Sequence, residues 1–133
     1  FKVIVIGAGA SGLCAAVNLK AAGVPFQVFE RRESVGGVWQ DNRYPGARVD
    51  IGSHFYCYSF EPADHWTEYF SQHPELREYF DRVMRRHGVD AHCRFNTEVT
   101  AARYAESRAI LEEEKPDLLV THWPVDTHRD HRA

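Results

Sequence analysis

Three glycines near the N-terminus and one acidic residue downstream have the types and spacing that bind a dinucleotide. Gly7, Gly9 and Gly12 form a G-x-G-x-x-G pattern. In this pattern the first glycine permits a tight turn, the second lets backbone approach a diphosphate, and the third lets a helix pack on the preceding strand. Glu30 follows 18 residues after Gly12, where the pattern places a carboxylate that accepts hydrogen bonds from a ribose diol. These residues indicate an adenine dinucleotide as cofactor.

The segments around the glycines have the periodicity of a βαβ unit. The continuous apolar run at 3–6 predicts a strand buried on both faces, as in a parallel sheet. A helix is expected over 11–22, with free N-terminal N–H groups directed at a diphosphate. A second strand over 26–29 leads to Glu30. An ordinary βαβ turn without a ligand is the alternative. The helix's apolar stripe consists of Leu13, Ala16, Val17 and Leu19.

Length and composition limit the classes of protein that fit. With 133 residues, the chain holds one modest domain, whereas a two-domain oxidoreductase needs more than about 250, so the length leaves open whether the chain is a fragment. The chain starts at Phe1 without methionine, and we expect that upstream residues were removed. The 44% hydrophobic content, 26% charged content and net charge of −3 describe a soluble globular protein. This charge favours neither nucleic acid nor an anionic membrane surface as partner.

The cysteines and the apolar N-terminus indicate the cellular compartment of the protein. Cys14, Cys57 and Cys93 are widely spaced, without a C-x-x-C pair, so neither a disulfide framework nor a cysteine zinc site is indicated. Reduced thiols suit the cytoplasm. The N-terminal apolar run lacks a basic lead and is broken by glycines, so we expect no signal peptide and no membrane segment.

A long loop over 31–60 follows the second predicted strand. It is rich in glycine, arginine and aromatic residues, and loops of this length inside compact domains are usually functional. The pair Gly36 and Gly37 permits close backbone approach to a diphosphate or ribityl chain. Its aromatic residues suit an isoalloxazine better than a nicotinamide alone, although core packing is the alternative for each. They are Trp39, Tyr44, Phe55, Tyr56, Tyr58 and Phe60.

Five motifs together resemble a known family. They are GAGASG, Glu30, GGVW at 36–39, RYPGARVD at 43–50 and YCYSF at 56–60. Residues 1–105 resemble the N-terminal FAD-binding domain of Baeyer-Villiger monooxygenases, within the flavin-containing monooxygenases. RYPGARVD with YCYSF is the most discriminating pair. The resemblance implies an α/β, truncated Rossmann-like FAD-binding fold with a parallel sheet, to which the periodicity of residues 107–121 adds an appended helix-strand unit.

The resemblance also implies an activity and a role for each motif-matched residue. The family uses FAD, NADPH and oxygen to insert an oxygen atom into a ketone or to oxidise a soft heteroatom. Asp50 would support an active-site arginine that stabilises a negatively charged peroxyflavin, and that arginine has no counterpart here. The implied cofactor contacts are Gly7, Gly9, Ser11 and Gly12 for the diphosphate, Glu30 for the ribose, Gly37, Val38 and Trp39 for the ribityl and flavin side, Asp50 and Tyr56 beside the isoalloxazine, Arg48 for the nicotinamide nucleotide, and the Val99 backbone for the adenine.

The chemistry of a flavin peroxide agrees with this resemblance. Such a peroxide must stay deprotonated and away from bulk water, so its site needs cationic support and dry walls. Arg43 and Arg48 with Asp50 would supply part of that charge network. A solvated ion pair is the alternative for Arg43.

The segment 62–88 has helical, amphipathic periodicity. Pro74 marks the start of a second helix or a kink. The aromatic and apolar stripe is interpreted as core packing, and His65, His73 and His87 as solvent-facing. Strands are then expected over 91–95 and 98–104. The stripe consists of Trp66, Tyr69, Phe70, Leu76, Tyr79, Phe80, Val83 and Met84.

The C-terminal residues resemble a different family. A helix over 107–114 and a strand over 117–121 are expected to dock as another βα layer on the sheet begun by 3–6. Residues 108–133 are similar to a fragment of the PIG-L-type zinc deacetylases of N-acetylglucosaminyl groups. That resemblance implies His131 as a metal ligand, with His128 and Asp130 nearby. The family's A-H-P-D-D element is missing, and a catalytic zinc needs three protein ligands, so we expect adventitious zinc or none.

Three interpretations follow. The first is an FAD-binding domain (1–105) joined near residue 106 to a foreign tail (106–133). The second is a zinc hydrolase, and the third is a non-catalytic chimera. The partner in the first case is a small organic substrate of the full-length enzyme.

Overall fold

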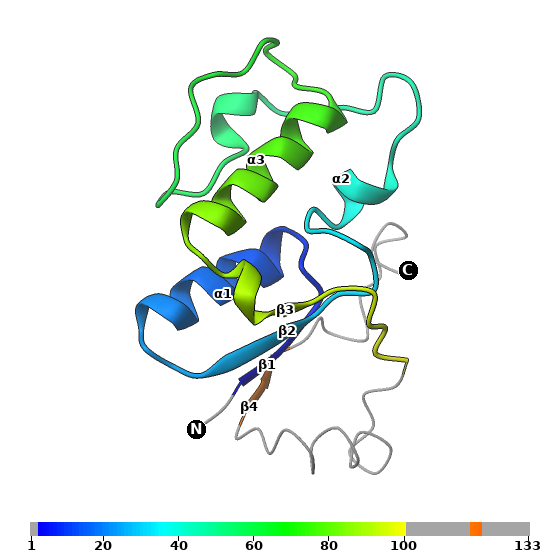
Figure 1. The fold of residues 1–133 in the computed structure, drawn as a ribbon. Coiled ribbons are helices and arrows are strands. Elements are labelled where there is room, and N and C mark those ends of the chain that lie inside the picture. The colour runs from blue at the N-terminus through cyan, green and yellow to red at the C-terminus, as the bar shows by residue number, and fades with distance from the viewer. Residues whose placement is uncertain (1–2, 101–117, 121–133) are drawn as a thin grey trace.

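The computed structural model describes residues 3–100 and 118–120. Within them, four strands form one parallel sheet in the order β3-β2-β1-β4 (Figure 1). The strands are β1 (Val3–Ile6), β2 (Phe26–Phe29), β3 (Cys93–Arg94) and β4 (Leu118–Val120). The strands predicted over 3–6 and 26–29 are therefore confirmed, and the strand predicted over 117–121 is confirmed at its described residues 118–120, which pair with β1 as expected. The fold is the α/β, Rossmann-like arrangement that the sequence indicates.

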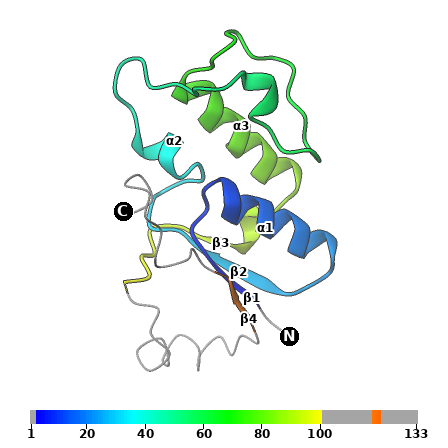
Figure 2. The ribbon, with the colours of Figure 1, turned by 180° about the vertical axis from the view of Figure 1, so that it is seen from behind.

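Two longer helices lie in layers above this sheet. The helix α1 (Ala10–Ala21) contacts β1 and β2. The helix α3 (His73–Arg86) packs on the side of α1 that faces away from the sheet (Figures 1 and 2). The helix α2 (Val38–Asp41) is short, and 3₁₀ turns occupy Ser53–Phe55 and Asp90–His92. The helix predicted over 11–22 is thus confirmed within one residue at each end.

The core lies between the sheet and the two helices. Leu13, Ala16 and Val17 on α1 are buried, as the predicted stripe requires. They belong to one cluster with side chains of β1, β2 and α3, so burial of the apolar stripes holds the layers together. The buried members from those elements are Val3, Val5, Phe26, Val28, Tyr79, Phe80, Val83 and Met84.

The prediction of a helix starting at 62 is wrong for residues 62–72. These residues pair with an earlier loop, because the N–H of Ser53 donates to Tyr69 O (2.8 Å) and that of Val49 to Ser71 O (3.1 Å). Trp66, Tyr69 and Phe70 therefore lie on a loop, although their spacing is helical. Backbone groups bonded to a distant loop are not available for i to i−4 bonds. The alternative that a second helix starts at Pro74 is confirmed, since Pro74 lies in the first turn of α3.

The strands predicted over 91–95 and 98–104 are shorter than expected or absent. Residues 90–92 form a 3₁₀ turn, and β3 holds only Cys93 and Arg94. Asn96 has φ 53°, and its N–H and that of Thr97 donate to Arg32 O and Glu30 O. The chain turns back toward β2 there, so 98–100 form no strand. Residues 101–104 and the predicted helix at 107–114 lie outside the described residues.

Two of the three histidines interpreted as solvent-facing are partly buried. His65 is exposed, whereas His87 Nε2 lies 3.0 Å from Glu61 Oε2, and His73 Nδ1 is buried. Glu61 is itself buried and also pairs with Arg86 at 2.8 Å. The two helix-end residues Arg86 and His87 thus surround one buried carboxylate, an interaction between distant segments that the local pattern does not reveal.

The hydroxyl of Tyr79 gives a test of this packing. It accepts a hydrogen bond from Tyr58 N–H (2.7 Å) and donates one to Glu61 O (2.8 Å) inside the core. We expect Tyr79→Phe to lower the free energy of unfolding by about 1–3 kcal/mol, because both backbone groups lose a buried partner. Urea denaturation measures this. Tyr69→Phe, at a side chain that is 63% exposed, is the control, and equal losses in the two variants would contradict the assignment.

Candidate functional site

The turn between β1 and α1 is built around two glycines in contact. Gly7 has φ +92°, a left-handed conformation that favours glycine, and its N–H donates to Phe29 O at 2.8 Å. A Cβ on Gly12 would lie 1.9 Å from Gly7 O, so only glycine fits there. These two positions give the tight turn and the close helix packing that the pattern predicts.

The N-terminus of α1 is open to a ligand. Gly9 is its N-cap residue, no side chain caps the helix, and no acidic residue lies in the first turn. The first helical bond runs from Leu13 N–H to Gly9 O (2.9 Å), so the preceding amides have no intrahelical acceptor. Ser11, in the same turn, is exposed. Such free amides, with the positive end of the helix dipole, bind anions.

A second glycine turn lies against the first. Gly37 has φ +56°, and a Cβ on it would be 2.8 Å from the Cα of Gly9. The N–H of Gly36 donates to Ala8 O (3.1 Å). The structure thus brings together Gly9 and Gly37, two residues whose motifs predict contacts to neighbouring parts of one cofactor.

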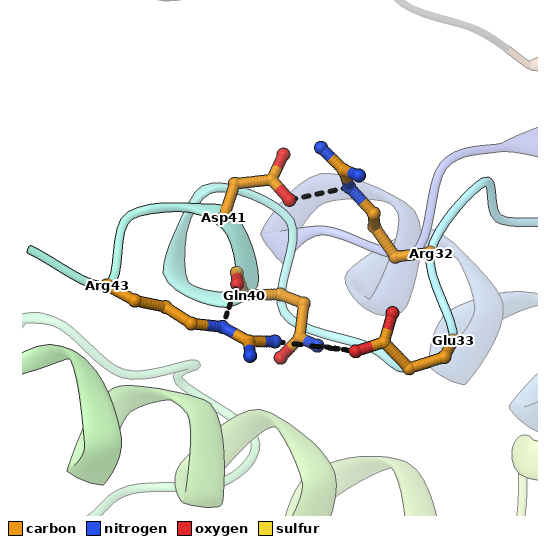
Figure 3. Close-up of a pocket in the computed structure, with 5 residues that line it drawn as sticks. All are labelled: Arg32, Glu33, Gln40, Asp41 and Arg43. Atoms are coloured by element: carbon orange, nitrogen blue, oxygen red, sulfur yellow. Dashed lines mark hydrogen bonds and ion pairs between the residues drawn. The ribbon is translucent and has the colours of Figure 1, made fainter.

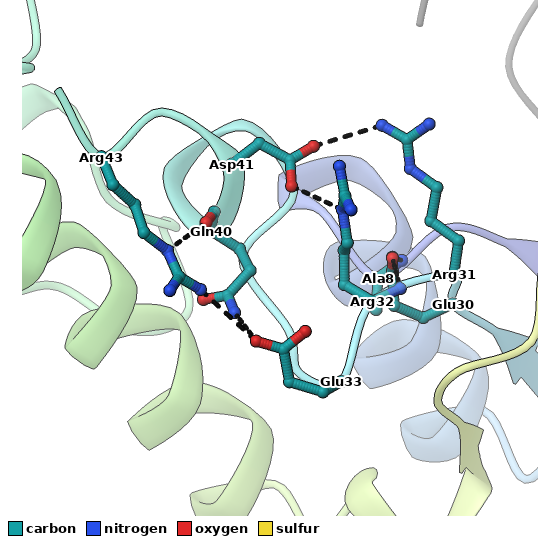
Figure 4. Close-up of polar contacts among 8 residues, drawn as sticks. All are labelled: Ala8, Glu30, Arg31, Arg32, Glu33, Gln40, Asp41 and Arg43. Atoms are coloured by element: carbon teal, nitrogen blue, oxygen red, sulfur yellow. Dashed lines mark hydrogen bonds and ion pairs between the residues drawn. The ribbon is translucent and has the colours of Figure 1, made fainter.

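Glu30 lies beside the same turn. It follows β2, is only 5% exposed, and its Oε2 accepts a hydrogen bond from Ala8 N–H at 2.6 Å (Figure 4). Its Oε1 accepts one from Arg32 N–H at 2.8 Å. A buried carboxylate with further lone pairs is a suitable acceptor for a ribose diol.

The sheet topology places this turn at a ligand-binding edge. In the order β3-β2-β1-β4, β1 has a later strand on each side. Ligands of such sheets bind outside the carboxyl ends of the strands, where the order reverses. The turn at Gly7 follows the carboxyl end of β1, so free amides, glycine surfaces and a buried acid meet at that edge. This donor and acceptor set fits an adenine dinucleotide.

A polar hollow of about 330 Å³ lies on the loop that carries the second glycine turn (Figure 3). Asp41 pairs with Arg32 (2.6 Å) and Arg31 (3.2 Å), so hydrogen bonding to Asp41 raises the pKa of the exposed Arg32. These contacts tie the end of β2 to α2. This hollow was not predicted from the sequence, where its one signal is the set of alternating charges around Gly36 and Gly37. Its lining residues are Arg32, Glu33, Gln40, Asp41 and Arg43.

The predicted flavin-side residues are partly brought together. Trp39 Nε1 donates to the Tyr56 hydroxyl at 2.9 Å, with the two rings nearly perpendicular, and Val38 beside Trp39 is exposed. Tyr58 and Phe60 stack at 4.8 Å against the core. Tyr44 and Phe55 are 62% and 73% exposed. The six aromatic residues therefore do not form a single wall, and core packing, the alternative, describes Tyr58 and Phe60.

The expected charge network among Arg43, Arg48 and Asp50 is not formed. Arg48 pairs with Glu68 (3.1 Å) and Arg43 with Glu33 (3.4 Å), so the ion-pair alternative for Arg43 applies. Asp50 is exposed and, within residues 3–100 and 118–120, makes no hydrogen bond or ion pair.

The two remaining predicted site residues are Val99 and His131. Val99 is half-buried and lies two residues after Thr97, whose N–H donates to Glu30 O (2.8 Å), so its segment is held beside Glu30. His131 lies outside the described residues. Among those described, no three His, Cys, Asp or Glu side chains are grouped to hold a metal ion, and no helix has the length and apolar character needed to cross a membrane.

Comparison with known proteins gives one family and a consistent set of relatives. A family described as NAD(P)-binding Rossmann-like domain matches residues 5–83. A Baeyer-Villiger monooxygenase of Streptomyces coelicolor is 46% identical over 99 residues, covering 74% of this chain and 19% of that protein. An uncharacterized monooxygenase of Sinorhizobium fredii is 38% identical over 127 residues, covering 91% of this chain and 19% of that protein.

Solved structures agree with these relatives. The crystal structure of OTEMO in complex with FAD and NADP has a TM-score of 0.73 and 42% identity, covering 80% of this chain and 21% of that one. An oxidized steroid monooxygenase bound to NADP has a TM-score of 0.71 and 41% identity, covering 74% and 20%. The chain spans about a fifth of the length of these proteins.

The half-buried thiol of Cys93, next to the Glu30 segment, provides a test of this region. Burial raises the pKa of Cys93 from 9.0 to about 11. At pH 8 we expect iodoacetamide to label it about a hundredfold more slowly in the folded chain than in urea, because thiolate is the nucleophile. Mass spectrometry follows the labelling. Since the folded pKa is raised, this thiol's contribution to stability is present below pH 9 and is lost between pH 9 and 11. Equal labelling in both states would show that the thiol is accessible.

Proposed function

The chain belongs to the family of NAD(P)-binding Rossmann-like domains, and we propose that it is the FAD-binding part of a Baeyer-Villiger-type, NADPH-using monooxygenase. Its relatives and structural neighbours include FAD-binding and Baeyer-Villiger monooxygenases, and one neighbour is solved with FAD and NADP. Because this chain spans about a fifth of their length, oxygen insertion into a ketone, or heteroatom oxidation, belongs to the whole protein. Within that protein, the role proposed for this chain is to hold FAD.

The contact between the two glycine turns carries this proposal. It joins the open N-terminus of α1 at Gly9 to Gly37 and the residues after it, so one extended ligand can meet both. The amides of α1, with Gly7, Gly12 and Ser11, would hold the diphosphate, and Glu30 the ribose. Gly37, Val38 and Trp39, with Tyr56, would contact the ribityl and flavin side, and the Val99 backbone the adenine. When bound, FAD supplies the redox chemistry with NADPH and oxygen.

Two further roles extend beyond FAD binding. Asp50, with its exposed and unpaired carboxylate among the described residues, would support a cationic side chain contributed by the rest of the enzyme. Arg48 would contact the nicotinamide nucleotide after leaving Glu68, an exposed ion pair that contributes only about 0.2–1 kcal/mol. A small organic substrate and a cytoplasmic location with reduced cysteines complete the proposal.

Flavin retention tests the proposal directly. We expect the purified chain, after FAD addition and desalting, to keep close to one flavin per chain by absorbance and fluorescence. Gly9→Val should weaken FAD affinity at least tenfold, because a Cβ at residue 9 already lies 3.4 Å from Gly37 Cα and the extra methyl groups occlude the diphosphate approach.

Ala22→Val is the matched control for that variant. It introduces the same side chain at the exposed opposite end of α1, so it should leave FAD affinity unchanged. Circular dichroism checks that both variants are folded. FAD affinity in Gly9→Val equal to that of the unaltered chain would sink the cofactor assignment.

The C-terminal segment supports a separate and narrower proposal. Residues 106–133 would be a foreign tail that resembles a zinc deacetylase, with His131 as ligand, and its support is the H-x-D-H motif. The relative from Sinorhizobium fredii supports a monooxygenase origin instead. Its alignment covers 91% of this chain, which is more than residues 1–105 alone can provide. The place of β4 beside β1 fits either origin.

Zinc content tests the hydrolase interpretation. Because one motif histidine does not complete a catalytic site, we expect elemental analysis of the dialysed protein to find far less than one zinc per chain. His131→Ala should then leave the zinc content unchanged, like the control His65→Ala. One zinc per chain, lost only in His131→Ala, would instead establish the hydrolase. A folded chain that retains neither zinc nor flavin would be the non-catalytic chimera.

A further inference from the structure

We propose that Glu30 has a second task besides receiving a ribose. Its carboxylate positions the glycine turn, and so directs the amides of α1 toward a diphosphate before the cofactor arrives. The inference rests on the proposed function, since the turn has a diphosphate to bind only if the chain holds a dinucleotide. The contacts of Glu30 themselves all lie within the protein.

The two oxygens of the Glu30 carboxylate accept hydrogen bonds from backbone N–H groups of two different segments. Oε2 is 2.6 Å from Ala8 N, in the turn after β1, and Oε1 is 2.8 Å from Arg32 N, in the loop after β2. The Glu30 backbone adds bonds to Arg94 O (2.9 Å) and from Thr97 N–H (2.8 Å). One buried residue therefore joins the ends of three strands, and Figure 4 shows its contact with Ala8.

The Ala8 peptide is the part of the turn that this carboxylate fixes. Ala8 is buried between Gly7 and Gly9, and its carbonyl accepts a hydrogen bond from Gly36 N–H (3.1 Å). With its N–H held by Glu30 and its C=O by Gly36, Ala8 has little freedom to rotate its flanking peptides. Glycine neighbours would otherwise permit many backbone conformations. The direction of the α1 N-terminus therefore depends on Glu30.

The two tasks of Glu30 are compatible. An ionised carboxylate offers about four lone-pair positions, and the two backbone N–H groups use two of them. The others remain for the hydroxyls of a ribose. Because the acceptor is already held in place by the protein, the binding of a dinucleotide does not have to order it.

Two substitutions separate the length of the side chain from its charge. Glu30→Gln keeps the length, but its NH₂ group cannot accept one of the two N–H bonds, so a donor would face a donor. Glu30→Asp keeps the charge and loses reach. Glu98→Gln, at an exposed residue, makes the same chemical change without a backbone contact and serves as the control.

The Ala8 amide reports on the proposed contact without any flavin. In ¹H–¹⁵N spectra of the cofactor-free chain, we expect its resonance to move upfield and its hydrogen exchange to quicken at least tenfold in Glu30→Gln and Glu30→Asp. The urea midpoint should fall in both variants and stay unchanged in Glu98→Gln. If either variant fails to fold, the unaltered chain still tests the contact, because its Ala8 amide, bonded to Glu30 Oε2, should exchange at least tenfold more slowly than the Ser11 amide, which has no intrahelical acceptor.

The outcomes distinguish this inference from the proposed function. An Ala8 resonance and exchange rate unchanged in both Glu30 variants, or an Ala8 amide that exchanges as fast as that of Ser11 in the unaltered chain, would overturn the positioning role even if FAD affinity falls. An unaltered chain that binds no flavin would instead contradict the proposed function and leave the Ala8 measurement valid.

Discussion

The carbonyl oxygen of Gly7 lies where a side chain on residue 12 would begin, at 1.9 Å from an ideal Cβ, and the position of α1 depends on this close approach. With hydrogen alone at position 12, the helix starts directly above the carboxyl end of β1 and presents Leu13, Ala16 and Val17 to the core. A methyl group there would separate helix from sheet, and both the buried apolar surface and the direction of the N-terminal amides would change with it.

The loop from β2 to α3 is held mainly by buried contacts. Its ion pairs through Asp41, Glu33 and Arg48 lie at the surface, where solvent screens the charges, so each pair contributes little to stability. The bond from Gly36 N–H to Ala8 O and the packing of Gly37 on Gly9 exclude water from backbone groups, and loss of such a buried partner costs about 1–3 kcal/mol. The glycine contacts therefore determine the position of the loop, and the ion pairs around the polar hollow contribute less to holding it there.

Features encoded by neighbouring residues were predictable from the sequence. The strands at 3–6 and 26–29, the helix α1 and the spacing of the three glycines with Glu30 follow from short apolar runs, from a helical period and from one fixed pattern. The loop at 62–72 was not predictable, because its aromatic residues have helical spacing while its backbone bonds to residues 49 and 53. The pairing of Arg48 with Glu68, and that of Glu30 with Ala8, also join distant segments and leave no local signal.

The pairing of β4 with β1 has a consequence for how the chain folds. Val3 lies beside Phe26 on one side and beside Leu118 on the other, so one edge of β1 is completed by a nearby segment and the other by a very distant one. Closing a short loop costs less entropy and is faster than closing a long one. The β1-α1-β2 unit, with its glycine turn, should thus assemble while the chain is still being synthesised, and the outer strand should join it last.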